Sequence, residues 1–130
     1  MWNFAWEKER LNQHSCLAVL DEAGRGPLAG PVVAACVVLP AGFDWRAAAL
    51  ALTQVRDSKQ LSPDKREVLL PKIRQIFPIA SIGVVGPGQI DRLNILQATF
   101  AAMRQALAAA QAEPRLVVVD GNRTVPGLQC

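Results

Sequence analysis

The sequence is poor in cysteine and lacks long apolar segments. Its three cysteines are odd in number, and no two have the C-x-x-C spacing of a zinc or redox site, which excludes a disulfide framework. No apolar run approaches the roughly 18 residues that a membrane helix requires. The start of the chain, MWNFAWEKER, lacks the order of a secretory signal, in which charged residues precede an apolar stretch. We therefore expect a cytoplasmic protein that does not associate with a membrane.

What the sequence does contain is enough apolar residues for one folded domain. The chain has 130 residues, 51% of them hydrophobic, and a net charge of +3. This length fits a single domain with a buried core. A small positive charge suits a phosphate-bearing partner but is common among ordinary domains. Basic residues gather in one stretch, for which a solvated helix face is the simpler explanation and nucleic-acid contact the alternative; they are Lys59, Lys65, Arg66, Lys72 and Arg74.

Apolar runs and turn residues predict an alternation of strands and helices. Valine-rich or leucine-rich runs predict strands over residues 16–20, 32–39, 79–85 and 116–119. The first two are joined by a glycine-rich loop and should be antiparallel. Residues 1–14 show no clear period and form an N-terminal extension, while residues 41–58 give no clear pattern. We predict an α/β domain over residues 15–130, with a mixed sheet flanked by helices.

Two helices are predicted between the later strands. Ser62 and Pro63 are typical of the cap and first position of a helix, and Pro71 should kink or shorten it. The second helix is capped by Asp91 and ends before Pro114. It carries an apolar stripe at spacings of three and four, which we interpret as core rather than as a cofactor site; the stripe consists of Leu93, Leu96, Phe100, Met103 and Leu107.

Two of the predicted strands run directly into acidic residues. Asp21 and Glu22 follow the first strand, and Asp120 follows the last. If these strands are parallel neighbours, their carboxylates meet beyond the carboxyl ends of the strands, where ligands gather in open α/β sheets. Carboxylates brought together in this way repel each other unless a cation neutralises them or a proton stays bound. Oxygen ligands without histidine or cysteine favour Mg²⁺ or Mn²⁺ over zinc, although acids at strand ends also serve as turn formers.

The glycine-rich loop between the first two strands allows two interpretations. Residues 24–30 match G-x-G-x-x-x-G, which is similar to a dinucleotide-binding turn of an oxidoreductase. That turn requires a following helix, and here Pro31 and a valine-rich strand follow. We prefer a loop whose small residues let the backbone approach a substrate while Arg25 meets a phosphate.

These residues together resemble the type 2 ribonuclease H family, the bacterial ribonucleases HII. The resemblance covers about residues 16–123 in four ordered blocks, namely DEAGRGPLAGPV from Asp21, DSKQLS from Asp57, IDRLNILQA from Ile90 and VVDGN from Val118. It implies a ribonuclease H-like fold. It also implies a hydrolase that cuts the RNA strand of RNA–DNA hybrids and ribonucleotides embedded in duplex DNA, leaving a 5′-phosphate and a 3′-hydroxyl.

The resemblance also implies roles for single residues. Asp21, Glu22 and Asp120 would be catalytic and would bind Mn²⁺ or Mg²⁺. The substrate, a hybrid or a ribonucleotide-containing duplex, would be bound by residues of three segments: Gly24, Arg25 and Gly26, then Lys59, then Asn94 and Gln97. For Asn94 and Gln97 an exposed helix face explains the pattern equally well.

The sequence departs from the family in its last part. Members continue past the aspartate matched by Asp120, with a fourth metal-binding aspartate and a tyrosine, whereas this sequence contains no tyrosine. We therefore expect a C-terminally truncated member whose fold is incomplete at the C-terminus and exposes an apolar sheet edge. We also expect a monomer. The alternative function is an inactive remnant that at most binds hybrid duplex.

Overall fold

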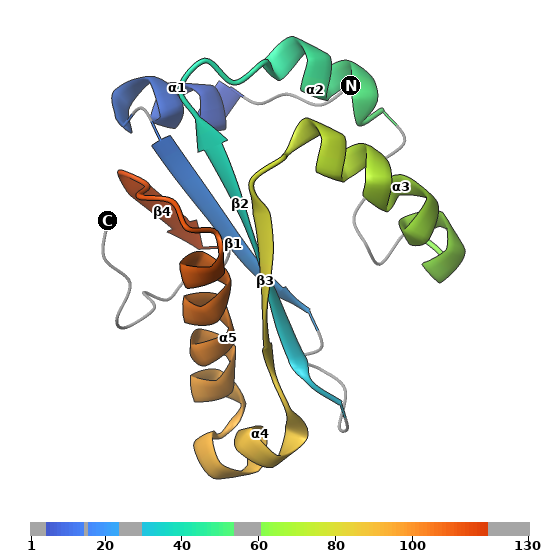
Figure 1. Cartoon of the computed structure of the whole chain (residues 1–130), viewed down its shortest axis with the longest axis vertical. Helices are drawn as coiled ribbons and strands as arrows, with labels where there is room; N and C mark the ends of the chain where they lie inside the picture. The colour runs from blue at the N-terminus through green and yellow to red at the C-terminus, as the bar shows by residue number, and fades with distance from the viewer. Residues whose placement is uncertain (1–4, 15, 24–29, 54–60, 120–130) are drawn as a thin grey trace.

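In the part of the chain that the structure describes, the fold is a four-stranded mixed sheet with helices around it (Figure 1). The computed structural model describes residues 5–14, 16–23, 30–53 and 61–119. In chain order the elements are α1 (Ala5–His14), β1 (Cys16–Ala23), β2 (Val32–Pro40), α2 (Trp45–Ala51), α3 (Pro63–Ile76), β3 (Ala80–Val85), α4 (Pro87–Leu93), α5 (Ile95–Ala109) and β4 (Leu116–Val119). The strand order is β3-β2-β1-β4. β2 is antiparallel to both β1 and β3, and β4 is parallel to β1. The parallel pairing of β4 with β1 is the condition under which the two acidic strand ends were expected to meet.

The first strand is longer than predicted. The apolar run ends at Leu20, but β1 continues to Ala23 because residues 21–23 pair with residues 33–35 of β2. Asp21 and Glu22 therefore lie within a hydrogen-bonded strand and not after it. Since side chains alternate along a strand, the two carboxylates leave the sheet on opposite faces.

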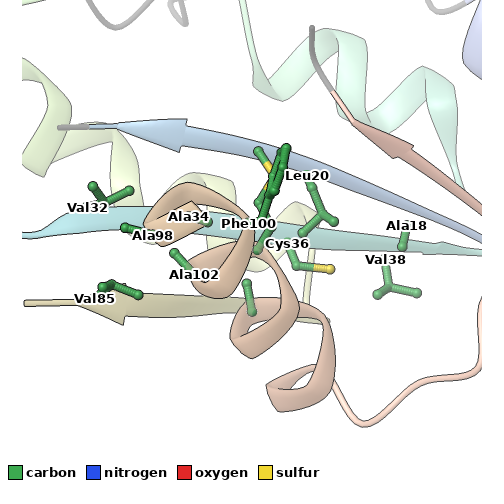
Figure 2. Close-up of a cluster of buried hydrophobic side chains, with 12 residues drawn as sticks. Ala18, Leu20, Val32, Ala34, Cys36, Val38, Val85, Ala98, Phe100 and Ala102 are labelled. Carbon is green, nitrogen blue, oxygen red and sulfur yellow. The ribbon is translucent and has the colours of Figure 1, made fainter. Parts of the chain in front are cut away.

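One face of the sheet packs against α5 and forms the larger core (Figure 2). We call it the α5-side core; its buried residues are Ala18, Leu20, Val32, Ala34, Cys36, Val38, Val85, Ala98, Phe100, Ala102, Met103 and Ala106. Phe100 and Met103 are buried here, as the apolar stripe predicted. Alanines at every fourth position of α5 let this helix lie close to the strands, because only methyl groups separate the two backbones.

The opposite face has a smaller core, which we call the second core. Leu11, Leu17 and Leu39 are buried in it, and it includes Val19, Val37, Leu116 and Val118. Phe43 is stacked on Phe77 with ring centroids 5.4 Å apart and meets Trp45 edge-on at 4.9 Å. The β3 residues on this face remain uncovered, with Ile82 59% and Val84 45% exposed.

Two helices were not predicted. Residues 5–14 form α1, although the sequence there shows no clear period. Among the residues of this helix whose side chains the structure describes, Leu11 is the one buried in the core. α2 lies in the stretch that gave no pattern. Asp44 caps it, because its carboxylate accepts a hydrogen bond of 2.9 Å from the Ala47 N–H.

The helix α3 begins as predicted but is not shortened by its proline. The Ser62 hydroxyl accepts from the Lys65 N–H at 3.1 Å, and Pro63 occupies the first turn. The helix continues through Pro71 to Ile76. Both Pro71 and Glu67 are exposed, so the Glu67 carbonyl that loses its N–H partner can be hydrated instead. Leu69 is buried, while Ile73 and Ile76 are half-buried.

The single long helix of the sequence analysis is two helices, α4 and α5, with a break at Asn94. Asn94 has a φ of 70° and caps α5, since its Oδ1 accepts from the Gln97 N–H at 3.0 Å. Asp91 lies inside α4, so its assignment as the cap was wrong. Leu93 belongs to α4 and is 37% exposed, so it does not continue the buried stripe.

The cysteines of the described residues are unpaired, as expected. Cys36 is fully buried and Cys16 half-buried. Burial raises the pKa of the Cys36 thiol above its ordinary value of 9.0, against a smaller lowering by its hydrogen bond with Ser81. Among the described helices, none combines the length and the apolarity that crossing a membrane would take.

Candidate functional site

Several chain segments converge at one end of the sheet. The ends of β1, β3 and β4 and the start of β2 all lie there, because β2 alone runs in the opposite direction. Figure 2 places Ala98 of α5 beside Val32 and Val85 at this end, with Ala18 and Val38 farther along the sheet. The start of α5 is therefore at the same end, and so is α4 (Figure 1). We call this region the acidic end of the sheet, after Asp21 and Glu22.

Asp21 and Glu22 are held by strand pairing and differ in their surroundings. Asp21 is exposed, and its Oδ1 accepts a hydrogen bond of 2.8 Å from the Glu22 N–H. Its neighbour Val19 packs in the second core, so alternation puts Asp21 on that face. Glu22 is half-buried and shares the face of Leu20, towards α5.

The register of β4 bears directly on Asp120. Val119, the last described residue of β4, pairs with Leu20, the residue before Asp21. Asp120 itself lies outside the described residues. The parallel pairing on which the convergence of the acids depends is thus confirmed, as far as the described part of β4 extends.

Among the described residues, no three His, Cys, Asp or Glu side chains are grouped closely enough to hold a metal ion.

The remaining candidate residues divide into two groups. Gly24, Arg25, Gly26 and Lys59 lie outside the described residues. Asn94 and Gln97 are described, and both are exposed at the acidic end of the sheet. After the loop the chain enters β2 at Val32, so a strand follows and the helix required by a dinucleotide-binding turn does not.

Asn94 has a structural role that the sequence pattern did not indicate. Its backbone occupies the left-handed region, which asparagine tolerates better than most residues, and its side chain caps α5. The cap uses the Oδ1 of Asn94 and not its amide nitrogen. The Asn94 side chain is exposed. Asparagine is a favourable cap residue, but the apolar spacing runs across it from Leu93 to Leu96, so the pattern hid this cap.

We expect Asn94→Ala to lower the free energy of unfolding by about 1–2 kcal/mol, because it removes the cap and strains the backbone. Asn94→Gly removes the same cap but tolerates the positive φ, so it should cost only a few tenths of a kcal/mol. Urea unfolding followed by circular dichroism measures both values. Equal losses in the two variants would show that the backbone conformation of Asn94 is not strained by alanine.

The basic residues of α3 are on the surface. Lys65, Arg66, Lys72 and Arg74 are all exposed, as a solvated helix face requires. The guanidinium of Arg66 donates to the Leu61 carbonyl at 3.3 Å, across the start of the helix. Exposure alone is equally compatible with contact to a phosphate backbone, so these residues do not locate a substrate.

Solved structures share this fold. Ribonuclease H2 from Pyrococcus horikoshii superposes with a TM-score of 0.63 at 29% identity, over 82% of this chain and 52% of that one. Bst-RNase HIII in complex with Mn²⁺ gives a TM-score of 0.59 at 24% identity, over 84% of this chain and 37% of that one. The fold is therefore of the ribonuclease H-like α/β class, as the resemblance predicted.

Sequence comparison identifies the family. The family model for ribonuclease HII matches residues 19–129. The ribonuclease HII of Chlorobium phaeobacteroides is 49% identical over 112 residues, which are 86% of this chain and 54% of that protein. That of Pelodictyon phaeoclathratiforme is 53% identical over 104 residues, 80% of this chain and 50% of that protein. The chain belongs to the ribonuclease HII family, and it spans about half the length of these curated relatives.

Proposed function

We propose that this chain carries the catalytic acids of a metal-dependent endonuclease. Its substrates would be the RNA strand of RNA–DNA hybrids and ribonucleotides embedded in duplex DNA, with 5′-phosphate and 3′-hydroxyl products. The observation that carries the proposal is the pairing of Leu20 with Val119, since each residue directly precedes a candidate metal ligand. Membership of the ribonuclease HII family supports the reaction class.

The acids at this end fit a hard divalent cation. Asp21 is an exposed carboxylate, and Glu22 supplies a second one from the other face of the same strand. If β4 keeps its alternation, Asp120 shares the face of Asp21, because Leu116 and Val118 pack in the second core as Val19 does. Asp21, Glu22 and Asp120 would then hold Mn²⁺ or Mg²⁺, ions that prefer oxygen ligands. Held there, the cation would supply the chemistry that activates a water and stabilises the leaving oxygen at a phosphodiester.

The other candidate residues would bind and orient the substrate. The backbone around Gly24 and Gly26 would approach the 2′-hydroxyl, which distinguishes RNA from DNA, while Arg25 would pair with a phosphate. Lys59 would hold the nucleic-acid backbone. Asn94 and Gln97, exposed at the acidic end, would contact the duplex from the start of α5. In Asn94 the amide nitrogen would donate, because Oδ1 serves the cap.

A nicking assay tests the proposal. The chain is incubated with Mn²⁺ and a DNA duplex containing one ribonucleotide, and the products are mapped at single-nucleotide resolution. We expect a nick on the 5′ side of the ribonucleotide that EDTA prevents, and no cut in an all-DNA duplex of the same sequence. Duplex binding without a nick would contradict the proposal and favour the inactive remnant as the function of this chain.

A further inference from the structure

The helix α4 is held in place at the acidic end of the sheet. It begins just after β3 ends, and one residue, Asn94, separates it from α5 (Figure 1). Ile90 packs against the α5-side core, and its carbonyl accepts a hydrogen bond of 2.8 Å from the Asn94 N–H. The other side chains of α4 therefore start from fixed positions beside the candidate site.

Arg92 leaves α4 on the side away from this core. Successive residues of a helix are about 100° apart around its axis, so Arg92 lies about 160° from Ile90. Arg92 is exposed, and so is Gln89, which is three residues earlier and therefore its neighbour on the helix surface. The outer face of α4 thus presents a guanidinium group and an amide group, and both can donate hydrogen bonds.

The guanidinium group of Arg92 is available to an external anion. Among the residues that the structure describes, Arg92 takes part in no ion pair. The adjacent acid, Asp91, points in a different direction, because neighbouring side chains in the sequence of a helix do not face each other. A phosphate is the anion that suits such a group best, since it can accept two parallel hydrogen bonds from one guanidinium.

The place of Arg92 in the last turn of α4 also has a purely structural explanation. A cation there interacts favourably with the C-terminal end of the helix dipole. Arg74 has the equivalent place in the last turn of α3 and is also exposed. The two arginines differ in location, because α3 leads into the start of β3 whereas α4 follows its end (Figure 1). Arg74 is therefore a matched control for the structural explanation.

We propose that Arg92 binds a phosphate of the substrate duplex outside the part that Asn94 and Gln97 contact, and that Gln89 supports this contact. Two residues separate the Cα atoms of Arg92 and Asn94 by at most about 7 Å. One strand of a duplex carries a phosphate about every 3.4 Å along its axis. The phosphate therefore lies within a few nucleotides of the other two contacts. The inference rests on the proposed function, which supplies the substrate.

The salt dependence of binding tests the contact. The probe is a DNA duplex containing one ribonucleotide, bound in Ca²⁺ in place of Mn²⁺ and checked on a gel to be intact. Arg92→Gln should weaken binding about threefold or more, and it should reduce the slope of log affinity against log salt by about one, the contribution of one phosphate. Arg74→Gln removes the same charge and should change affinity less than about twofold, with the slope unchanged. Equal effects of the two variants would overturn the proposal, because net charge alone would explain them.

Neutral phosphate analogues locate the contact. A methylphosphonate is placed at one position of the duplex at a time, and the unmodified chain is compared with Arg92→Gln. At one position, within a few nucleotides of the ribonucleotide, the two proteins should bind equally, because the partner of Arg92 has lost its charge. If the difference persisted at every position, Arg92 would not bind a phosphate.

Unfolding measurements separate this contact from a structural role of Arg92. The urea midpoints of Arg92→Gln and the unmodified chain should agree, since the side chain is exposed. A lower midpoint with an unchanged salt slope would overturn the proposal. Arg92→Lys keeps the charge and should keep the slope while losing part of the affinity, because lysine cannot form the paired hydrogen bonds. If Arg92→Gln is unfolded, Arg92→Lys replaces it in the methylphosphonate comparison.

Nicking of the same duplex in Mn²⁺ keeps this inference separate from the proposed function. Nicking by the unmodified chain, with no effect of Arg92→Gln on affinity or slope, supports the nuclease and overturns the contact. Duplex binding that depends on Arg92 without any nick supports the contact and contradicts the nuclease. No binding of the duplex by the unmodified chain would overturn both.

Discussion

Replacing Asp21 by asparagine should reduce nicking at an embedded ribonucleotide on the order of 10²-fold or more, because it removes one anionic ligand of the proposed cation. The change is nearly isosteric. The remaining side-chain oxygen can still accept the 2.8 Å hydrogen bond from the Glu22 N–H, so the end of β1 should keep its conformation. Asp21 is also exposed, so its charge is not needed for the packing of either core. The expected loss is therefore one of chemistry and not of folding.

Initial rates over a series of Mn²⁺ concentrations test this expectation. A weakened metal site should recover part of its rate as Mn²⁺ is raised, and calorimetric titration should show weaker Mn²⁺ binding. Asp91→Asn is the matched control, since Asp91 is an exposed acid on α4 at the same end of the sheet. The initial nicking rate of Asp91→Asn should stay within about twofold of the rate of the unmodified chain. If the Asp21→Asn variant nicked at the full rate, Asp21 would not be a ligand of the proposed cation.

The strands of this fold were predictable because their sequences are locally consistent. Four apolar runs bounded by glycine, proline or acidic residues became the four strands, with small shifts at their ends. The parallel neighbours β1 and β4 confirmed the condition on which the meeting of the acids depended. The extension of β1 through Asp21 and Glu22 was not predictable, since pairing with β2 overrides the unfavourable strand propensity of acidic residues.

The helices were harder to predict where tertiary contacts replace a periodic pattern. α1 buries Leu11 and shows no stripe, so nothing in its own sequence reveals its face. The break at Asn94 was hidden because the apolar spacing continues across it from Leu93 to Leu96, although α4 and α5 are separate helices. A cap depends on a single side chain, whereas periodicity averages over several turns.

The candidate site could be predicted in outline but not in its geometry. The acidic strand ends and the order of the blocks identify the family and the end of the sheet. Strand alternation, which places Asp21 and Glu22 on opposite faces, follows only once β1 is known to continue past Leu20. The roles of all the candidate residues remain predictions, those of the described Asp21, Glu22, Asn94 and Gln97 included. Asp120, Lys59 and residues 24–26 also lie outside the described residues.

Gly83→Ala should lower the free energy of unfolding by about 3 kcal/mol or more, a large part of the roughly 5–15 kcal/mol that stabilises a typical domain. Gly83 lies on β3 where α5 crosses it, and the residue is buried. A methyl group there would lie 2.7 Å from the Ala106 nitrogen and 2.8 Å from Gln105 Cβ, and it would overlap the Ala102 carbonyl oxygen. Two of these three atoms are helix backbone, so no change of rotamer relieves the contact.

The substitution can be accommodated only if α5 moves away from β3. That movement would stretch two hydrogen bonds beside Gly83, from the Ser81 hydroxyl to the Ala106 carbonyl and from the Val84 N–H to Gln105. It would also open the contact between the alanines of α5 and the α5-side core.

Urea unfolding should show a lower midpoint for Gly83→Ala than for Gly88→Ala. The added methyl at Gly88 meets nothing within 4 Å, and it favours the helical conformation of α4, so this control should be neutral or stabilising by up to about 1 kcal/mol. Equal midpoints would mean that α5 does not lie as close to β3 as the structure places it, and the start of α5 would then no longer be fixed at the acidic end of the sheet.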